Sequence, residues 1–132
     1  MLTLVATWTE DDVVHESILA DGDEAATLFD QLTVRLVAAP SMVEVAMDGS
    51  GCALAIGAGR PETVVTYQSS LDPPYFISAG QPDRAGEIRF LYAGETTPYS
   101  AANAISVSDG RRALIEYVRD GGLPEGIEWE RL

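Results

Sequence analysis

The first twenty residues show a two-residue spacing of apolar side chains. Residues 2–8, LTLVATW, alternate apolar and polar positions, and this pattern predicts a half-buried strand. Residues 13–19, VVHESIL, are also strand-like, and two interpretations are open. The segment either pairs with the first strand or leads into the next element.

A helix is predicted to begin after Asp21. Glu24 follows three residues later, which is the spacing of a capping box, and Asp23 adds an acid to the first turn, where the helix dipole favours negative charge. Apolar residues then recur at spacings of three and four and form one stripe: Ala25, Leu28, Phe29, Leu32 and Leu36. Pro40 limits the length of this helix.

From Ser41 onward the apolar spacing returns to two. The segments SMVEVAMD and CALAIGAG, joined by GSG, predict a hairpin, and ETVVTYQ, YFISAG and EIRFLYAG predict three further strands. The connections are rich in Gly, Pro and Asp and are too short for parallel crossovers, which need a dozen or more residues. The sheet is therefore predicted to be an antiparallel meander.

The last third of the chain predicts a loop and a second helix. ETTPYSAANA is rich in small and polar residues, as loops are, and Ser106 or Ser108 can cap the helix that follows. Its inward face is predicted to hold Ala113, Leu114, Tyr117 and Val118, and the helix should end at Gly121 and Gly122. The predicted fold is α+β, a single domain over residues 1–132. An antiparallel sheet of five to six strands has two helices covering one face and leaves the other face partly open.

The chain ends with GGLPEGIEWERL, in which Trp129 stands between two acids. The glycines and the proline predict an irregular or extended segment. Trp129 can either pin this segment to the core or face a partner, and a Trp near a chain end favours the first role. Glu128 and Glu130 would then point to the opposite face.

Net charge is the most unusual property of the composition. Eight arginines, no lysine and 21 acids give a formal net charge of −13. A field of this sign repels phosphate, which argues against direct binding to nucleic acid or to an anionic membrane and favours a basic protein partner. The alternative is that the charge only keeps the protein in solution.

The N-terminus and the cysteine count favour a cytoplasmic protein. MLTLVATWTEDD has no basic region before its apolar run, and no stretch approaches the roughly 20 apolar residues of a membrane span. Cys52 is the only cysteine, so no internal disulfide can form. Its apolar neighbours in GCALAIG predict a small buried residue.

Candidate chemistry for catalysis is sparse. His15 is the only histidine, which weakens any Ser-His-Asp or multi-histidine zinc arrangement. GAGRPE lacks the Lys-Ser/Thr ending of a phosphate-binding loop, and pairs of carboxylates arise by chance among 21 acids. The prediction is a protein that is not an enzyme, with no catalytic, cofactor-binding or metal-binding residue and no cofactor.

Aromatic residues near acids suit protein binding instead. Tyrosine and tryptophan are enriched at interface hot spots, although Tyr67, Tyr92 and Tyr117 fit core positions better. Tyr99 lies in the loop-like GETTPYS and is expected outside. Asp72, with Pro73, Pro74 and Tyr75, forms a stiff turn that can orient an acid and an aromatic ring.

Several C-terminal motifs together resemble a known family. In order, they are YFISAG, EIRFLYAG, an Asn-containing loop in AANA, a helix ending in GGLP, and a terminal Trp with an acid. This succession resembles the first immunity-protein family of bacterial polymorphic-toxin systems, and the helix before VEVAMDGSGCALAIGAG extends the likeness over most of the chain.

The resemblance implies a small α+β protein that neutralises a cognate toxin by binding it. Toxins of these systems are commonly nucleic-acid deaminases and sometimes nucleases, so the expected partner is a basic toxin domain, and occlusion of its active site is the expected mechanism. Six residues are predicted to bind this partner: Asp72, Tyr75, Glu95, Tyr99, Glu128 and Glu130. The alternatives are an acidic secretion chaperone and another non-catalytic binding or scaffold domain.

Overall fold

A computed structural model describes residues 3–132 and begins with an antiparallel strand pair. Strands β1 (Leu4–Glu10) and β2 (Val13–Leu19) pair with Trp8 opposite His15, which confirms the first of the two interpretations. The predicted start of β1 at Leu2 lies outside the described residues. Asp11 and Asp12 make the turn with φ angles of 54° and 61°, as a two-residue type I′ hairpin requires.

Helix α1 (Gly22–Arg35) begins at the predicted cap. The Asp21 carboxylate accepts a hydrogen bond from the Glu24 backbone N–H, and the Glu24 carboxylate accepts one from the Ala20 N–H at 2.8 Å. The predicted stripe faces the sheet, with Ala25, Phe29, Leu32 and Leu36 buried and Leu28 partly buried.

Helix α2 (Val107–Asp120) also has the predicted ends. Ser106, rather than Ser108, is the N-cap and accepts a hydrogen bond from the Asp109 N–H at 3.1 Å. Gly121 ends the helix with a φ of 75° in the left-handed region, which costs glycine no steric strain. Within residues 3–132, neither of the two 14-residue helices combines the length and apolar content that a membrane crossing demands.

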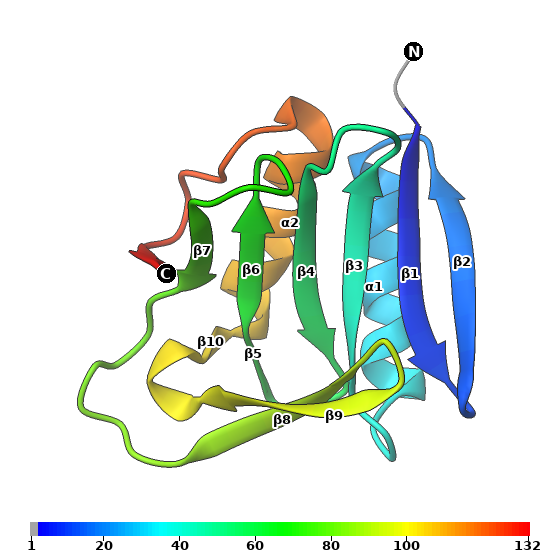
Figure 1. The fold of residues 1–132 in the computed structure, drawn as a ribbon. Coiled ribbons are helices and arrows are strands. Elements are labelled where there is room, and N and C mark those ends of the chain that lie inside the picture. The colour runs from blue at the N-terminus through cyan, green and yellow to red at the C-terminus, as the bar shows by residue number, and fades with distance from the viewer. Residues whose placement is uncertain (1–2) are drawn as a thin grey trace.

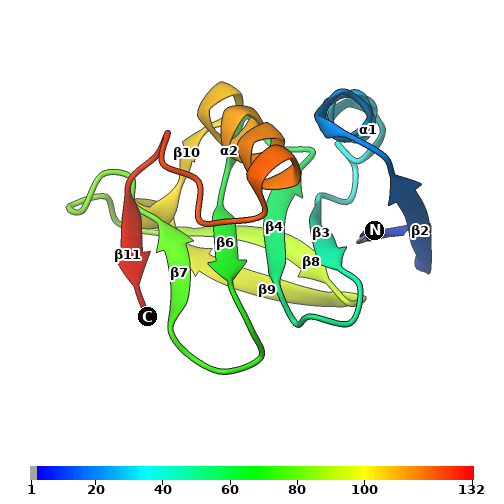
Figure 2. The same cartoon turned by 90° about the horizontal axis from the view of Figure 1, so that it is seen from above.

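Both helices cover one face of the main sheet, as Figure 2 shows. Beyond β1 and β2, this sheet contains β3 (Ser41–Met47), β4 (Ala53–Ala58), β6 (Val65–Gln68), β7 (Tyr75–Ser78) and β11 (Trp129–Arg131). The strand order is β11-β7-β6-β4-β3-β1-β2 (Figure 1). A separate two-stranded sheet joins β5 (Glu62–Thr63) to β10 (Ile105–Ser106). The α+β prediction is confirmed, but the main sheet formed by residues 3–132 has nine strands, more than the five to six predicted.

The meander prediction is confirmed for β3, β4, β6 and β7, which pair antiparallel in chain order, and is wrong for the fifth predicted strand. After β2, helix α1 returns the chain across the sheet, so that β3 pairs with β1. β3 therefore lies between β4 and β1. β8 (Glu87–Tyr92) does not continue from β7; it joins β3 through one parallel pair, Ser41 with Leu91. The expected loop after β8 is strand β9 (Glu95–Ser100) followed by the 3-10 helix Ala101–Asn103. Pro98 is tolerated in β9 because this strand is an edge, where one backbone N–H is not needed.

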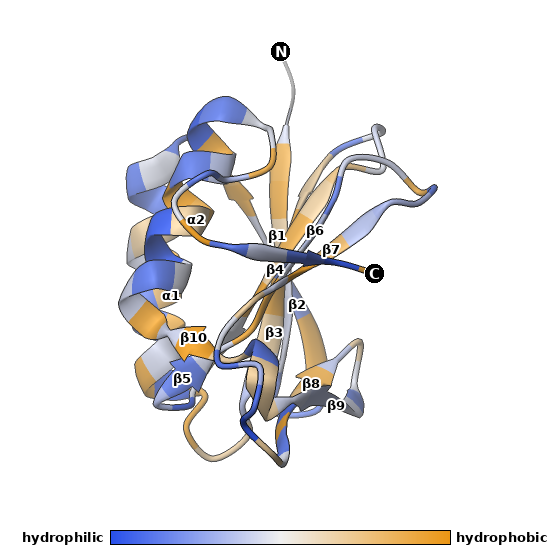
Figure 3. Cartoon of the chain, turned by 90° about the vertical axis from the view of Figure 1, so that its left-hand side faces the viewer, coloured by the Kyte–Doolittle hydropathy of each residue, from blue (hydrophilic) through white to orange (hydrophobic). Residues whose placement is uncertain are grey.

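The β8–β9 hairpin covers the lower part of the face opposite the helices (Figures 1 and 3). A second core cluster lies beneath it and includes Met42, Ala55, Ile77 and Phe90. Phe90 approaches Gly57 so closely that a Cβ at residue 57 would lie 2.8 Å from its Cε2. The sheet therefore has one face under two helices and another that is open only above the hairpin, and this upper part is called the open face below.

Candidate functional site

A row of residues crosses seven strands on the face opposite the helices; its two ends are accessible, whereas Ala55 and Ile77 lie in the second core cluster beneath the β8–β9 hairpin. Antiparallel pairing places the members opposite one another, strand after strand, and alternation points their side chains away from the helices. We call this set the carboxylate row: Glu16, Thr7, Glu44, Ala55, Thr66, Ile77 and Glu130. Neighbouring strands lie about 4.8 Å apart, so Glu16 and Glu44 are about 10 Å apart, close to one Debye length at physiological salt.

The next row on the open face is uncharged. It consists of Ile18, Val5, Ala46, Ala53, Gln68 and Tyr75. Its central members, Ala46 and Ala53, are small. Small side chains therefore lie beside the carboxylates, and a partner can approach the sheet closely there.

All arginines lie away from the open face. Strands β1 to β7 contain none, and the six ion pairs within the described part of the chain use arginines of α1, α2, β8 or the segment before β8. Arg131 is opposite Phe76 and so belongs to the helix-covered face. Arg60 lies over the Phe90 ring at 5.7 Å and donates to the Arg89 carbonyl. The electrostatic field above the open face is therefore negative.

Glu44 is the central acid of the carboxylate row and is only partly exposed. The Tyr92 hydroxyl donates a hydrogen bond to Glu44 Oε2. Burial, followed by this hydrogen bond, raises the pKa of Tyr92 far above its usual value, so the hydroxyl stays protonated and remains a donor at neutral pH. Within residues 3–132, Glu44 forms no ion pair.

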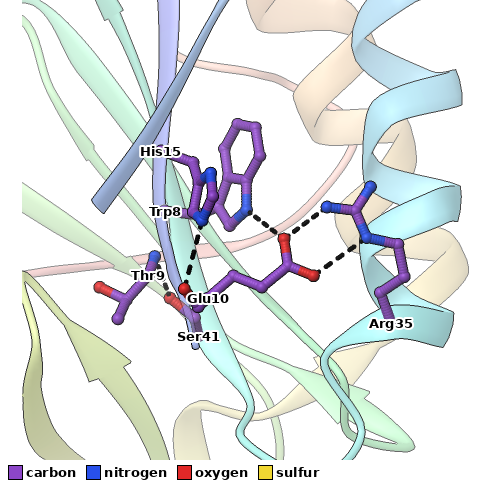
Figure 4. A network of polar contacts seen from close by, with 6 residues as sticks. All are labelled: Trp8, Thr9, Glu10, His15, Arg35 and Ser41. Carbon is purple, nitrogen blue, oxygen red and sulfur yellow. Dashed lines mark hydrogen bonds and ion pairs between the residues drawn. The ribbon is translucent and has the colours of Figure 1, made fainter. Parts of the chain in front are cut away.

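The C-terminal end of β1 takes part in a polar network beside α1 (Figure 4). Glu10 accepts hydrogen bonds from Trp8 Nε1 at 3.2 Å and from the Arg35 guanidinium. His15 stacks on Trp8 with ring centroids 5.7 Å apart, and its Nε2 lies 3.2 Å from the Glu10 carbonyl oxygen. Because a carbonyl oxygen only accepts, His15 Nε2 is the donor. These contacts tie the β1–β2 hairpin to α1, which is a structural role.

Replacing Glu10 by glutamine is expected to flatten the acid side of the stability profile. The hydrogen bond from Arg35, followed by that from Trp8, holds the pKa of Glu10 below its usual value. Because the pKa is lower in the folded state, this contribution is complete above about pH 4.5 and is lost as pH falls through the folded-state pKa. Melting temperatures measured from about pH 7 to about pH 3 should fall more steeply in the wild type than in Glu10→Gln. Parallel profiles would contradict this role.

Four of the six predicted partner-binding residues lie along the β7–β11 edge of the sheet. Asp72 is exposed in the β6–β7 loop, and Tyr75 begins β7, with its hydroxyl donating to the Leu71 carbonyl at 2.5 Å. Glu130 ends the carboxylate row, where it accepts a hydrogen bond from Asn103 Nδ2 at 3.2 Å. Glu128 is exposed just before β11. Asp72 and Glu128 stand at opposite ends of β7, so the four share an edge without forming a cluster.

The other two predicted residues lie on the β8–β9 hairpin. Glu95 is exposed beside the hairpin turn, which is held to β1 by a hydrogen bond from the Gly94 N–H to Thr9 Oγ1 at 3.2 Å. The expectation that Tyr99 is outside is wrong. It lies in β9, is partly buried and meets Phe90 edge-on at 6.4 Å, and burial raises its pKa to about 12.

Two acids on the open face were missed by sequence reasoning, Glu16 and Glu44. In SMVEVAMD, Glu44 alternates with Val43 and Val45, and both valines are buried under the helices. Alternation places Glu44 on the other face, but one carboxylate in one strand does not reveal a row. That row exists only after the strands are in register.

Trp129 pins the chain end to the core, as the favoured interpretation held. Its ring packs against the helix-side core cluster, 6.4 Å from Tyr67, and its Nε1 donates to the Pro124 carbonyl at 2.7 Å. Glu130 points to the opposite face, where it meets Asn103. The acid beside the tryptophan is thus available at the surface while the ring is held inside.

The remaining candidate chemistry is structural. Cys52 is buried, as predicted, with its Sγ near the hydroxyls of Tyr67 and Tyr117. Both tyrosines are buried as well, and burial raises the pKa of Tyr67 to about 12. No three histidine, cysteine, aspartate or glutamate side chains in residues 3–132 gather in a way that would hold a metal ion.

Comparison with known proteins assigns a family to the chain. The family model described as "Immunity protein Imm1" matches residues 5–131, which is nearly the whole sequence. A comparison with the curated proteins finds no match.

Proposed function

Because the chain belongs to the Imm1 family of immunity proteins, it functions in immunity against a toxin, and we propose that the toxin is a nucleic-acid deaminase whose active site it occludes. The C-terminal motifs resemble a family whose toxins are commonly nucleic-acid deaminases, which supports this choice of target, and a nuclease is the second candidate. The proposal treats residues 1–132 as one non-catalytic immunity domain that acts in the cytoplasm, where such a toxin meets nucleic acid.

One observation carries the proposal: on the face opposite the helices, the seven paired strands from β2 to β11 within residues 3–132 present three carboxylates, Glu16, Glu44 and Glu130, and no arginine. An enzyme that acts on DNA or RNA presents a basic cleft to attract phosphates. An acidic surface is drawn to the same cleft and excludes the substrate from it. The open face, with the predicted residues Asp72, Tyr75, Glu95, Tyr99, Glu128 and Glu130 along its borders, has the charge for this contact.

Charge alone does not account for the tight binding that protection against a toxin requires. A nanomolar dissociation constant corresponds to about −12 kcal/mol, whereas exposed ion pairs contribute about 0.2–1 kcal/mol each. The partly buried Glu44 differs from the exposed acids, because a partner that covers it removes water from a charge pair. We therefore assign steering to the exposed acids and anchoring to Glu44 and its surroundings.

Neutralising Asp72, Glu95 and Glu128 together is expected to slow association with the toxin about three- to tenfold. The reason is that exposed charges raise the encounter rate and have less influence on dissociation. Stopped-flow kinetics with a catalytically inactive form of the toxin encoded beside this protein measures both rates. The wild-type association rate should also fall as salt increases, and that fall should be smaller in the triple variant.

A control for net charge removes three acids that lie on the helix-covered side: Asp23, Asp30, which pairs with Arg111, and Asp109, which pairs with Arg112. Their neutralisation changes the net charge by the same amount and should leave most of the rate intact. Equal slowing by both triple variants would show that net charge, and not this surface, steers the encounter. A 1:1 complex with a folded toxin is expected; a dimer that holds an unfolded segment would instead support the secretion-chaperone alternative.

A further inference from the structure

A small cavity opens at the meeting point of the open face and the β8–β9 turn. Its volume is about 150 Å³, and its walls include Thr7, Val14, Met42, Glu44, Tyr92 and Ala93. Four strands of the main sheet, β1, β2, β3 and β8, and the β8–β9 turn supply these residues. The Gly94–Thr9 hydrogen bond holds the turn against β1.

The size of the cavity selects the kind of group it can hold. Small-molecule and cofactor sites measure about 300–1,000 Å³, well above this volume. A cavity of about 150 Å³ holds a group the size of benzene. One side chain of a partner protein fits this space, whereas a nucleotide or a cofactor does not.

The residues that line the cavity favour a side chain with an apolar stem and a positively charged end. Val14, Met42 and Ala93 offer apolar surface, and Glu44 supplies a carboxylate with no ion pair within residues 3–132. Tyr92 satisfies one Glu44 oxygen and leaves acceptor capacity for a second donor. A purely apolar occupant would strip water from the carboxylate without replacing it, which is unfavourable.

We infer that this cavity receives an arginine or lysine side chain of the cognate toxin, with the methylene stem against Val14, Met42 and Ala93 and the cation on Glu44. This inference rests on the proposed function and deepens it by naming the chemistry of the contact. Arginine and lysine bury their stems along apolar surface while the charged end finds a polar partner. Arginine is also enriched at interface hot spots.

Acids on the neighbouring elements favour the approach of such a side chain. Glu16 of β2 is opposite Thr7 of β1, and Glu95 of β9 is opposite Tyr92 of β8. The tight β1–β2 turn adds the exposed pair Asp11 and Asp12. Within residues 3–132, none of these four acids forms an ion pair.

Two variants test the cavity by different means. Glu44→Gln removes the charge with little change of shape, and Val14→Trp fills the entrance without changing charge. Each is expected to raise the Kd for the inactive toxin at least about tenfold, because each removes a desolvated central contact. Val13→Trp is the matched control: both valines are 55% exposed, but Val13 is opposite Glu10 and points to the helix-covered face. Its Kd should stay within about twofold of the wild type.

A double-mutant cycle identifies the occupant. Each arginine and lysine of the toxin is replaced by methionine and measured against wild type and Glu44→Gln by titration calorimetry, with melting curves to check folding. One toxin residue should lose its contribution when Glu44 is already glutamine. Additive effects for every toxin cation, or an unchanged Kd for both cavity variants, would overturn the inference while leaving the proposed function intact. If the wild type fails to bind the toxin, the proposed function itself fails.

Discussion

Replacing Phe90 by alanine is expected to lower the free energy of unfolding by about 3–5 kcal/mol, the range for large-to-small changes of buried aromatic residues. Phe90 is 1% exposed and has the tip of its ring against Gly57, with Tyr99 in an edge-to-face arrangement and the Arg60 guanidinium over the ring. Only one parallel residue pair joins β8 to β3, so backbone pairing contributes little to holding the hairpin there. Urea unfolding measures the loss.

Gly57→Ala tests the same contact from the sheet side. A methyl group at residue 57 would overlap the Phe90 ring, and such overpacking typically costs about 1–3 kcal/mol. In the Phe90→Ala background the ring is absent, so the same methyl should cost much less. Val34→Ala, at a position that is 76% exposed, is the control and should change stability by less than about 0.5 kcal/mol. Strict additivity of the Gly57 and Phe90 changes in unfolding free energy would contradict a direct contact between these two residues.

Replacing Trp129 by alanine is expected to lower the free energy of unfolding by about 3 kcal/mol and to leave toxin association unchanged. The side chain is partly buried, which places the loss at the lower end of the range for Trp→Ala. It packs near Tyr67 and holds the preceding turn through the hydrogen bond to the Pro124 carbonyl. Chemical denaturation and stopped-flow binding below the variant's melting temperature separate the two effects.

Trp129→Phe separates ring packing from the hydrogen bond. Phenylalanine keeps an aromatic group beside Tyr67 but has no N–H to donate, so this variant should recover more than half of the stability lost in Trp129→Ala. Glu130→Gln, the neighbouring residue on the other face, should leave stability nearly unchanged. If Trp129→Ala slowed association tenfold with its fold intact, the ring would belong to the interface and not to the core.

Local chemistry allowed the helices and most strands to be predicted. Asp21 and Ser106 cap helices because their side chains satisfy backbone N–H groups a few residues away, and Gly121 ends a helix because it adopts a positive φ freely. The β3–β4 hairpin followed from alternation around GSG. These signals involve residues near one another in the chain, so no knowledge of the fold is needed to read them.

Strand β9 shows where local chemistry is insufficient. ETTPYS is polar and contains Pro98, so it resembles a loop when taken by itself. It is a strand because β8 pairs with it and because Tyr99 packs on Phe90. Tertiary packing overrides weak local propensity in such segments.

The candidate site was also predicted only in part. Acids and aromatic residues next to turn-forming Gly and Pro indicated a binding role for Glu128, Glu130, Asp72 and Tyr75. The structure places these four along one edge of the sheet. Glu16, Glu44 and the cavity beside them were not predicted. Their positions depend on strands that are far apart in the chain.

The sequence by itself determined the helix boundaries, the strand-rich middle, the family and the excess of acids, because these depend on composition and on short-range periodicity. Only the tertiary structure decided where the charge is concentrated. The order and register of seven strands align Glu16, Glu44 and Glu130 on one face, while folding places the arginines elsewhere. Register is set by burial and pairing across the whole sheet, and a shift of one residue would turn each carboxylate to the opposite face.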